Sequence, residues 1–228
     1  MSRVPPDEYL ARAYALSTTT EARTLYNEWS SLYDTDLNSA GYASPRRAVE
    51  TVLKYLPTSC SQTTSTPRAS EPLKILDAGC GTGLVGTYIS TSTLSNKSEF
   101  TLQLDGLDLS EGMLSVAREK NVYSSLTPTD LNDPIPKPSG TYDVVICVGT
   151  LTEGHVGPNV LGEFVRVAAA ETGIVVVTVH DKVWVSMGFK AEVERLEKEG
   201  RLSVLATEEF GILDGESKGG RMVVLRRA

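Results

Sequence analysis

Residues 74–86 read KILDAGCGTGLVG, and this stretch decides the fold of the chain. An apolar run leads into an acidic residue, three glycines alternate with other residues, and a helix-like segment follows. A short apolar run of this kind is typical of a buried parallel strand. Glycine suits the turn after it because the backbone must turn tightly and approach a ligand without a Cβ in the way. The stretch therefore predicts a strand, turn and helix of a parallel sheet, with a nucleotide-like ligand at the turn.

Two interpretations compete for the ligand at this turn. Counted from Gly81, the spacing G-x-G-x-x-G fits a dinucleotide fingerprint, and Asp108 lies at about the expected distance beyond it. Counted from Asp77, the pattern D-x-G-x-G-x-G resembles motif I of the class I S-adenosylmethionine-dependent methyltransferases. The turn should open at Gly79, and a fingerprint that starts there would need glycine at 82 or 84, where the chain has Thr82 and Leu84. A carboxylate beside the turn would also repel a pyrophosphate, whereas it suits a ligand with an ammonium and a sulfonium. We therefore favour the methyltransferase interpretation.

The charge of the chain argues against nucleic acid as a partner. The 228 residues carry a net charge of −7, and no basic run is longer than the pairs Arg46-Arg47 and Arg226-Arg227. Binding driven by counterion release needs a basic face. With 40% apolar and 22% charged residues, the chain has the composition of one globular α/β domain.

The cysteines and the N-terminus bear on the compartment. Cys60, Cys80 and Cys147 are odd in number, and two of them fall in expected core or turn segments. This favours free thiols in a reducing compartment over a disulfide framework. The N-terminus has no basic region followed by an apolar core, and no apolar run reaches about 18 residues. We expect a cytoplasmic protein with no membrane partner.

Strand-like and helical segments alternate after residue 72. The expected strands cover 73–77, 101–108, 123–128, 142–148 and 173–180, and the expected helices cover 83–91, 110–120, 158–170 and 186–199. This alternation indicates βαβ units and a parallel sheet. Two final strand-like runs, 202–213 and 221–227, are joined by a Gly-rich turn and predict a hairpin. The predicted fold class is α/β: a Rossmann-like, seven-stranded, mostly parallel sheet with a C-terminal antiparallel hairpin and helices on both faces.

Three helices are expected ahead of the sheet, the second over about 21–37 with Thr20 as its cap and the third over 46–56. We expect residues 1–56 to form a helical cap or lid packed on the main domain. Residues 57–72 are rich in Ser, Thr and Pro and predict a mobile loop, like the polar stretch at 91–99. Residues 73–228 would form the S-adenosylmethionine-binding domain, in a single structural unit overall.

The resemblance implies roles for the first strand and its turn. Asp77, Gly79, Cys80, Gly81 and Gly83 would hold the methionine end of S-adenosylmethionine.

Later strand ends supply the rest of the cofactor site in this comparison. Asp108 ends the second strand, where it can accept both ribose hydroxyls, and Leu109 and Met113 follow, with Met113 beside the adenine. Asp130 matches the residue that accepts the adenine amino group, and the backbone amide of Leu131 would serve a ring nitrogen. A nearby acid at 133 is a rival for this role, and a turn-capping function is a further alternative.

The ends of the fourth and fifth strands hold the candidate catalytic groups. Cys147 would lie beside the methionine moiety and contribute its backbone rather than its thiol. His155 lies on the loop over the transferring methyl, where it could act as a base; a structural or substrate-shaping role is the competing interpretation. Methyl transfer from a sulfonium depends mainly on alignment and needs no base. His180-Asp181 is a second candidate pair, for which loop capping is the commoner role.

Aromatic residues ahead of the sheet are the remaining signal: Tyr26, Trp29, Tyr33 and Tyr42. Rings that close a cofactor cleft exclude water and attract a sulfonium, although ordinary core packing explains Trp29 equally well. Asp34 and Asp36 could steer a cationic substrate or simply belong to a solvated helix end.

A narrower resemblance rests on three runs: 26–34 (YNEWSSLYD), 41–45 (GYASP) and 154–156 (GHV). They are similar to small methyltransferases related to the Williams–Beuren region protein, a group with relatives in fungal biosynthetic pathways. This group implies small-molecule substrates.

The sequence thus predicts an S-adenosylmethionine-dependent methyltransferase that produces S-adenosylhomocysteine, uses no metal, and methylates oxygen or nitrogen of a small organic acceptor. We expect a monomer or homodimer. Three alternatives remain: an NAD-dependent oxidoreductase, a protein methyltransferase, and a non-methylating protein of the same fold.

Overall fold

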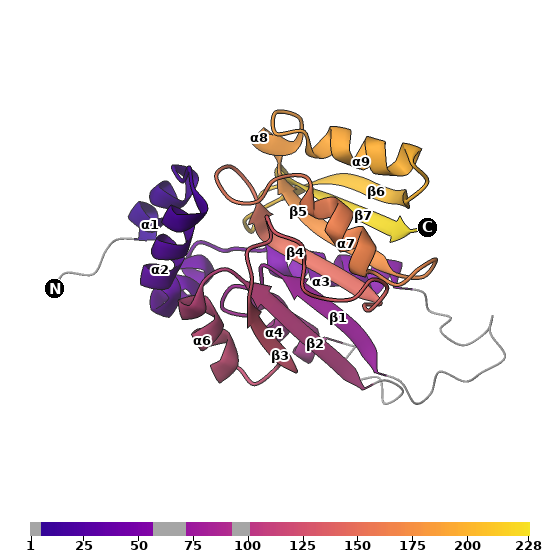
Figure 1. The fold of residues 1–228 in the computed structure, drawn as a ribbon. Coiled ribbons are helices and arrows are strands. Elements are labelled where there is room, and N and C mark those ends of the chain that lie inside the picture. The colour runs from indigo at the N-terminus through magenta and orange to yellow at the C-terminus, as the bar shows by residue number, and fades with distance from the viewer. Residues whose placement is uncertain (1–5, 57–71, 93–100) are drawn as a thin grey trace.

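The structure, a computed structural model, describes residues 6–56, 72–92 and 101–228. At its centre is a seven-stranded sheet (Figure 1). The strands are β1 (Leu73–Ala78), β2 (Leu102–Asp108), β3 (Ser125–Pro128), β4 (Val144–Leu151), β5 (Ile174–His180), β6 (Leu202–Gly211) and β7 (Gly219–Arg227). Their order is β3-β2-β1-β4-β5-β7-β6, with β1 to β5 parallel and β7 antiparallel to both β5 and β6. The predicted mostly parallel sheet with a C-terminal hairpin is confirmed.

The order of the strands locates the site. From β1 the chain extends through β2 and β3 on one side, and β4 and β5 continue on the other side. Ligands of open α/β sheets bind outside the carboxyl ends of the strands at such a switch point. The carboxyl ends of β1, β2 and β4 therefore mark the position of a cleft.

Helices cover both faces of the sheet, as predicted. They are α3 (Ser44–Tyr55), α4 (Leu84–Thr91), α6 (Glu111–Glu119), α7 (Val160–Val167), α8 (Asp181–Trp184) and α9 (Phe189–Lys198). One apolar cluster joins α3 and α4 to the sheet, and another joins α7, α8 and α9 to it. Because β4 and β5 are covered on both faces, their side chains are nearly all buried, which explains their uninterrupted apolar sequence.

Two helix boundaries differ from the prediction by three residues. The helix expected over 186–199 is α9, which begins at Phe189, because Gly188 before it is in the left-handed region (φ +85°). The short helix α8, which precedes α9, was not predicted. The helix expected over 158–170 ends at Val167. It ends there because the following residues leave the helix to bond with Tyr142, whose carbonyl accepts from the N–H of Ala169 at 2.7 Å.

The N-terminal helices α1 (Pro6–Tyr14) and α2 (Thr19–Ser39) lie beyond the carboxyl ends of the parallel strands (Figure 1). The cap of α2 is Thr18, not Thr20: its side chain accepts the N–H of Glu21, and the Glu21 carboxylate accepts the N–H of Thr18. The two helices share a small core that includes Tyr9, Leu25 and Trp29.

Helix α3 packs differently from α1 and α2. Its buried residues Ala48, Val49 and Val52 belong to the same apolar cluster as Ile75 of β1 and Val176 of β5. The expected cap of residues 1–56 is therefore divided in the structure. Its first two helices lie over the strand ends, and its third covers a face of the sheet.

The segment between α2 and α3 pairs with the loop that follows β6. Tyr42 forms an antiparallel bridge with Leu213. The N–H of Ala43 donates to the carbonyl of Ile212 at 2.9 Å, and the N–H of Asp214 donates to the carbonyl of Gly41 at 2.7 Å. The N-terminal helices are thereby joined to the C-terminal hairpin.

Other expectations are met only in part by the described residues. Cys80 and Cys147 are free and buried, whereas Cys60 and almost all of the loops expected at 57–72 and 91–99 lie outside those residues. In the part of the chain that the structure describes, no helix has the length and apolarity needed to cross a membrane.

Candidate active site

The Gly-rich turn after β1 holds the backbone close to β2 and β4. Gly79 has a φ of +74°, and a Cβ built on it would lie 2.2 Å from Oγ1 of Thr150. Only glycine permits both that conformation and that approach. The N–H groups of Gly79 and Cys80 donate to the carbonyl of Leu107 at 2.7 and 2.9 Å, which fixes the turn against the end of β2.

Asp108, at the end of β2, is held by the same turn. Its Oδ2 accepts the N–H of Gly81 and its Oδ1 accepts the N–H of Ser110, both at 2.8 Å. Burial raises the pKa of the Asp108 carboxyl above its ordinary value, although these N–H groups oppose the shift. Each carboxylate oxygen keeps room for a further donor. Asp108 can therefore accept two ligand hydroxyls without losing its own anchors.

Asp77 lies fully buried within β1. The hydroxyl of Tyr123 donates to its Oδ2 at 2.6 Å, and its Oδ1 has no hydrogen-bond partner within the described segments. Burial raises the pKa of Asp77 to about 7. A carboxylate with one unpartnered oxygen suits a ligand that brings a positive charge.

A cleft at the carboxyl ends of the strands contains about 670 Å³ of space unoccupied by atoms, with the open solvent at its mouth included. Of the predicted cofactor residues, seven line it: Gly79, Gly81, Asp108, Leu109, Met113, Asp130 and Leu131. Four others, Asp77, Cys80, Gly83 and Cys147, are buried and are not among its lining residues. Between the two candidate acids after β3, Asp130 lines the cleft and Asp133 is exposed outside it.

Sequence reasoning missed several residues of this cleft. Thr19 and Ala22 of α2, Asn132 after β3, and the stretch 148–150 of β4 all line it. Asn132 bonds Oδ1 of Asp130 through both its N–H (2.9 Å) and its side-chain Nδ2 (3.0 Å). The residue types of these missed positions carry no functional signal of their own. Only the position of a neighbouring motif could have indicated them.

A second cavity, with about 1340 Å³ of space when the open solvent at its mouth is included, lies between α1, α2, the end of β5 and the β6–β7 hairpin. Four residues line both cavities: Tyr26, Tyr33, Gly149 and His155. The predicted aromatic group is divided between the two, because Trp29 and Tyr42 line only the second. Trp29 is also a core residue, 1% exposed and stacked on Tyr9 with ring centroids 5.2 Å apart.

His155 lies at the junction of the two cavities with a defined hydrogen-bond pattern. Its Nδ1 is 2.7 Å from the carbonyl oxygen of Glu153, and its Nε2 is 2.8 Å from the hydroxyl of Tyr26. A carbonyl only accepts, so we assign the proton to Nδ1, and Nε2 then accepts from Tyr26. Burial lowers the pKa of His155, so the imidazole is neutral at pH 7.

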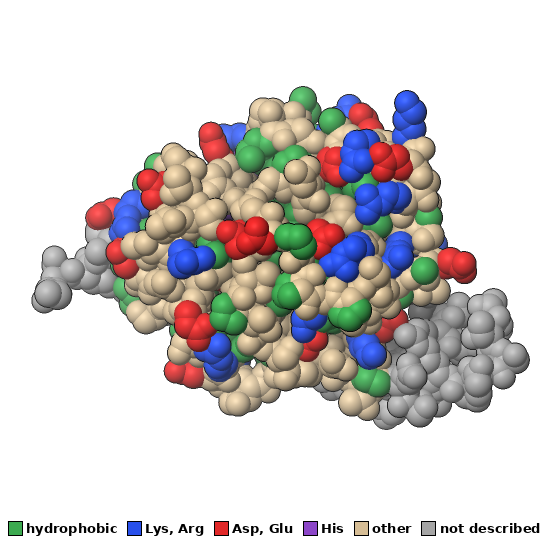
Figure 2. Space-filling model, viewed as in Figure 1, with side chains coloured by type: hydrophobic (Ala, Val, Ile, Leu, Met, Phe, Trp, Pro, Cys, Tyr) green, Lys and Arg blue, Asp and Glu red, His purple; other side chains and the backbone are tan. Residues whose placement is uncertain are grey.

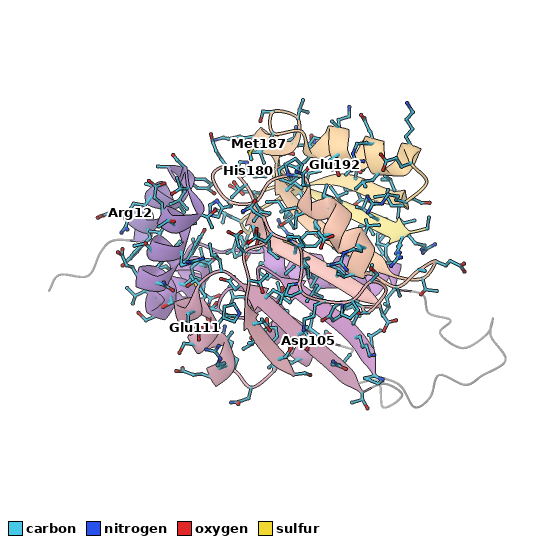
Figure 3. The ribbon with its side chains drawn as sticks, in the orientation of Figure 1. Arg12, Asp105, Glu111, His180, Met187 and Glu192 are labelled. Carbon is cyan, nitrogen blue, oxygen red and sulfur yellow. The ribbon has the colours of Figure 1, made fainter. Side chains whose placement is uncertain are left out.

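His180, the second histidine considered, caps a helix. It lies at the end of β5 beside α8 (Figure 3), and its Nδ1 accepts the N–H of Lys182 at 3.2 Å. Its ring also meets Tyr14 edge-on, with centroids 5.9 Å apart. It lines the second cavity but not the first.

Asp34 and Asp36, for which the sequence left open the steering of a cationic substrate or a solvated helix end, are both bonded to other residues of the protein. Asp36 is 2% exposed and accepts the Trp29 Nε1–H at 2.9 Å. Asp34 accepts from the hydroxyl of Thr82 in the Gly-rich turn and from Lys120 Nζ. Both carboxylates are therefore used within the protein.

Helix α2 is also tied to the segment after Asp108. Oδ1 of Asn27 accepts from the Ser110 hydroxyl at 2.7 Å and from the N–H of Gly112 at 2.9 Å. Together with the Asp34–Thr82 bond, these contacts hold the helix that carries Tyr26 against the elements that form the cleft. Across the described ranges, no group of three or more His, Cys, Asp or Glu side chains is arranged to hold a metal ion.

Comparison with known proteins agrees with this geometry. Residues 75–171 match the family model of a methyltransferase domain. Human methyltransferase-like protein 27 is 35% identical over 139 residues, covering 60% of this chain and 50% of that protein, which supports the resemblance to the Williams–Beuren region group. A probable 18S rRNA (guanine-N(7))-methyltransferase of Dictyostelium discoideum is 28% identical over 119 residues, covering 52% of this chain and 38% of that protein. The chain thus spans about half or less of the length of these relatives.

Among solved structures, the fold is similar to magnesium protoporphyrin IX methyltransferase from Synechocystis with bound S-adenosylhomocysteine. The TM-score is 0.59 at 17% identity, and the match covers 92% of this chain and 99% of the other. The family match, the strand order and the C-terminal hairpin together oppose the dinucleotide interpretation of the turn. In its methyltransferase-domain match and in its fold, the chain is similar to the class I S-adenosylmethionine-dependent methyltransferases.

Proposed function

We propose that this protein transfers a methyl group from S-adenosylmethionine to a small organic acceptor. The observation that carries the proposal is the pair of adjoining cavities, one beside Asp108 and the Gly-rich turn and one between α1, α2 and the hairpin. A methyltransferase needs two binding sites that meet where the methyl group moves, because transfer depends on holding the two reactants in line.

The residues of the first cavity fit S-adenosylmethionine. Asp108 has acceptor capacity for two ribose hydroxyls, and Leu109 and Met113 offer apolar surface to an adenine beside Asp130. Asp77 does not line this cavity, but its buried Oδ1 has no hydrogen-bond partner within the described segments and would suit the positive methionine end. When bound, the cofactor would supply a methyl group attached to a sulfonium. After transfer of the methyl group, the sulfur would leave as a neutral thioether.

Calorimetric titration with S-adenosylmethionine and S-adenosylhomocysteine tests the cofactor half of the proposal. We expect both to bind the wild type, and we expect Asp108→Ala to weaken each by about 100-fold, the scale of hydrogen bonds to a charged group. No binding of either ligand by the wild type would overturn the proposal. Asp133→Ala, which changes an exposed acid outside the cleft, is the matched control.

RNA is a second candidate acceptor, because the Dictyostelium relative bears the name of an rRNA methyltransferase. The net charge of −7 opposes it. On the face in Figure 2, basic and acidic side chains are interspersed rather than gathered into a basic stripe. Incubation of the protein with labelled S-adenosylmethionine and either total RNA or a small-molecule extract separates the candidates. Label found in RNA would contradict the small-molecule acceptor and would make RNA the acceptor instead.

A further inference from the structure

The two cavities meet at a polar pair that comes from distant parts of the chain. Tyr26 belongs to α2 and His155 to the loop after β4, and their side chains are 2.8 Å apart. Both line both cavities. A group that reaches from the second cavity toward the first therefore passes this hydrogen bond.

The charged side chains of the second cavity lie away from that junction. Among its described lining residues, the carboxylate and ammonium groups belong to Glu216 and Lys218, both exposed in the β6–β7 turn. Glu216 also accepts the N–H of Leu213 at 3.0 Å. Among the side chains that line the second cavity, a charged acceptor would thus find no counterion beside Tyr26 and His155, and burying an unpaired charge is costly.

The remaining lining of the second cavity is mostly apolar. Tyr14, Trp29, Tyr42 and Phe210 contribute aromatic rings, and aliphatic residues such as Leu37 and Ile212 lie between them. Aromatic and aliphatic walls with a few placed polar groups are typical of sites for apolar small molecules.

We propose that the second cavity binds a neutral, largely apolar alcohol or phenol, and that Tyr26 and His155 take up the proton that its hydroxyl group loses. This inference rests on the proposed function and names its acceptor class. The geometry matches the task, because Nε2 of His155 is an acceptor already bonded to the hydroxyl of Tyr26, and both residues line both cavities.

The proton balance of the step is complete. The acceptor oxygen forms the new bond to the methyl carbon, the carbon–sulfur bond breaks with its electron pair on sulfur, and the O–H proton must leave. Tyr26 accepts that proton on its oxygen as its own proton passes to His155 Nε2. The imidazolium keeps its Nδ1–H on the Glu153 carbonyl and later releases one proton to water.

The first test is binding to the protein saturated with S-adenosylhomocysteine, measured by calorimetry with three probes that share a naphthalene ring. These are 1-naphthol, 1-naphthoate and 1-naphthylmethylammonium. We expect 1-naphthol to bind about tenfold more tightly than either charged probe, because the charged probes lose hydration without gaining a partner. Absence of 1-naphthol binding, or equal or tighter binding of a charged probe, would overturn the acceptor class. Binding of S-adenosylhomocysteine alone tests the proposed function separately.

A matched pair of variants locates the probe. Thr152 lines only the second cavity, so Thr152→Trp should abolish 1-naphthol binding while affinity for S-adenosylhomocysteine stays within about threefold. Thr172→Trp places the same ring on an exposed turn outside both cavities and should bind like the wild type. Undiminished 1-naphthol binding by Thr152→Trp would contradict the assignment of the cavity.

The second test concerns the proton. We expect Tyr26→Phe and His155→Gln each to lower kcat for 1-naphthol by about 100-fold, and the double variant by little more, because the two groups act in one step. KM and calorimetric 1-naphthol affinity should change less than about threefold, whereas a merely structural role would weaken binding. Tyr88→Phe on α4 is the control. Transfer to 1-naphthylamine instead of 1-naphthol, transfer to neither, or wild-type kcat in both single variants would overturn the role of the pair.

Discussion

The two cavities of this protein are built in opposite ways. The cavity beside the Gly-rich turn is formed at strand ends, with carboxylates such as Asp108 held by backbone N–H groups. The second cavity is formed by aromatic and aliphatic side chains from α1, α2, the loop after β4 and the hairpin. The first arrangement fixes one ligand through charge and hydrogen bonds. The second leaves shape and apolar area to decide what binds, so a change in either cavity should leave the other largely intact.

The largest expected effect comes from the buried acid of the cofactor side. The folded-state pKa of Asp77 is raised to about 7, so its stabilising contribution is complete below the unfolded pKa near 4 and is lost as pH rises to about 7. At about 1.4 kcal/mol per pKa unit, the loss is at most about 4 kcal/mol. Asp77→Asn should remove this dependence of the free energy of unfolding on pH. The stability of the variant relative to the wild type should therefore rise between pH 4 and pH 8. Urea unfolding at several pH values measures the free energy of unfolding of each protein, with Asp133→Asn as the control. The same pH dependence in Asp77→Asn and in the wild type would contradict a raised pKa of Asp77.

Gly149 lies at the boundary of the two cavities and should be the next most sensitive position. Its φ is +75°, and a Cβ would lie 2.5 Å from the hydroxyl of Tyr42. Gly215 has a similar φ of +81° with no atom within 4 Å of a Cβ. Gly215→Ala should cost about 1 kcal/mol for the backbone alone, and Gly149→Ala about 3 kcal/mol because the Tyr42 contact adds to it. Thermal unfolding compares them; equal losses would mean that Tyr42 moves aside freely.

Asp130 and Asp133 allow the cofactor side to be resolved further. Asp130 lines the cleft and Asp133 does not. Asp130→Ala should weaken the binding of S-adenosylhomocysteine by about tenfold, or about 1.4 kcal/mol, because one hydrogen bond to the ligand is lost. Asp133→Ala should bind like the wild type in the same calorimetric titration. The reverse result would exchange the roles of the two acids.

The smallest expected effect concerns the connection between the two sides. Thr82 is 1% exposed and donates to Asp34 on α2, whereas Thr87 is exposed and donates to the carbonyl of Gly83. Thr82→Val should lower the free energy of unfolding by about 1 kcal/mol, the net value of a typical hydrogen bond. Thr87→Val should change it by less than about 0.5 kcal/mol. Similar values for the two variants would show that the bond to α2 contributes nothing to stability.

The fold and the first cavity could be predicted because their signals are local in the sequence. The run from Lys74 to Gly86 contains strand, turn and helix start in order, and Asp108 follows the next strand. The rule that parallel strands end at one edge then brings these groups together without knowledge of packing. The same rule does not say which atoms reach the cleft, so the complete burial of Asp77, outside the residues that line the cleft, was not predicted.

The second cavity could not be predicted in the same way. Its walls come from segments as far apart as Leu10 and Gly220, and their contact depends on how α1 and α2 pack. The bond between Tyr26 and His155 spans 129 positions. Both His155 and Tyr26 were named as candidates from the sequence, but the hydrogen bond between them was not predicted. The partners of Asp34 and Asp36 were not predicted because a carboxylate on a helix looks the same in sequence whether it meets solvent or a buried donor.

The pairing of residues 41–43 with the loop after β6 has a consequence for how such proteins diverge. That loop continues into the exposed turn at 214–218, which supplies Glu216 and Lys218 to the rim of the second cavity. Exposed turns tolerate insertion and replacement far better than the strands that they join. Natural variation in this turn can therefore change the rim of the second cavity, while Asp77 and Asp108, more than a hundred residues earlier in the chain, stay unchanged.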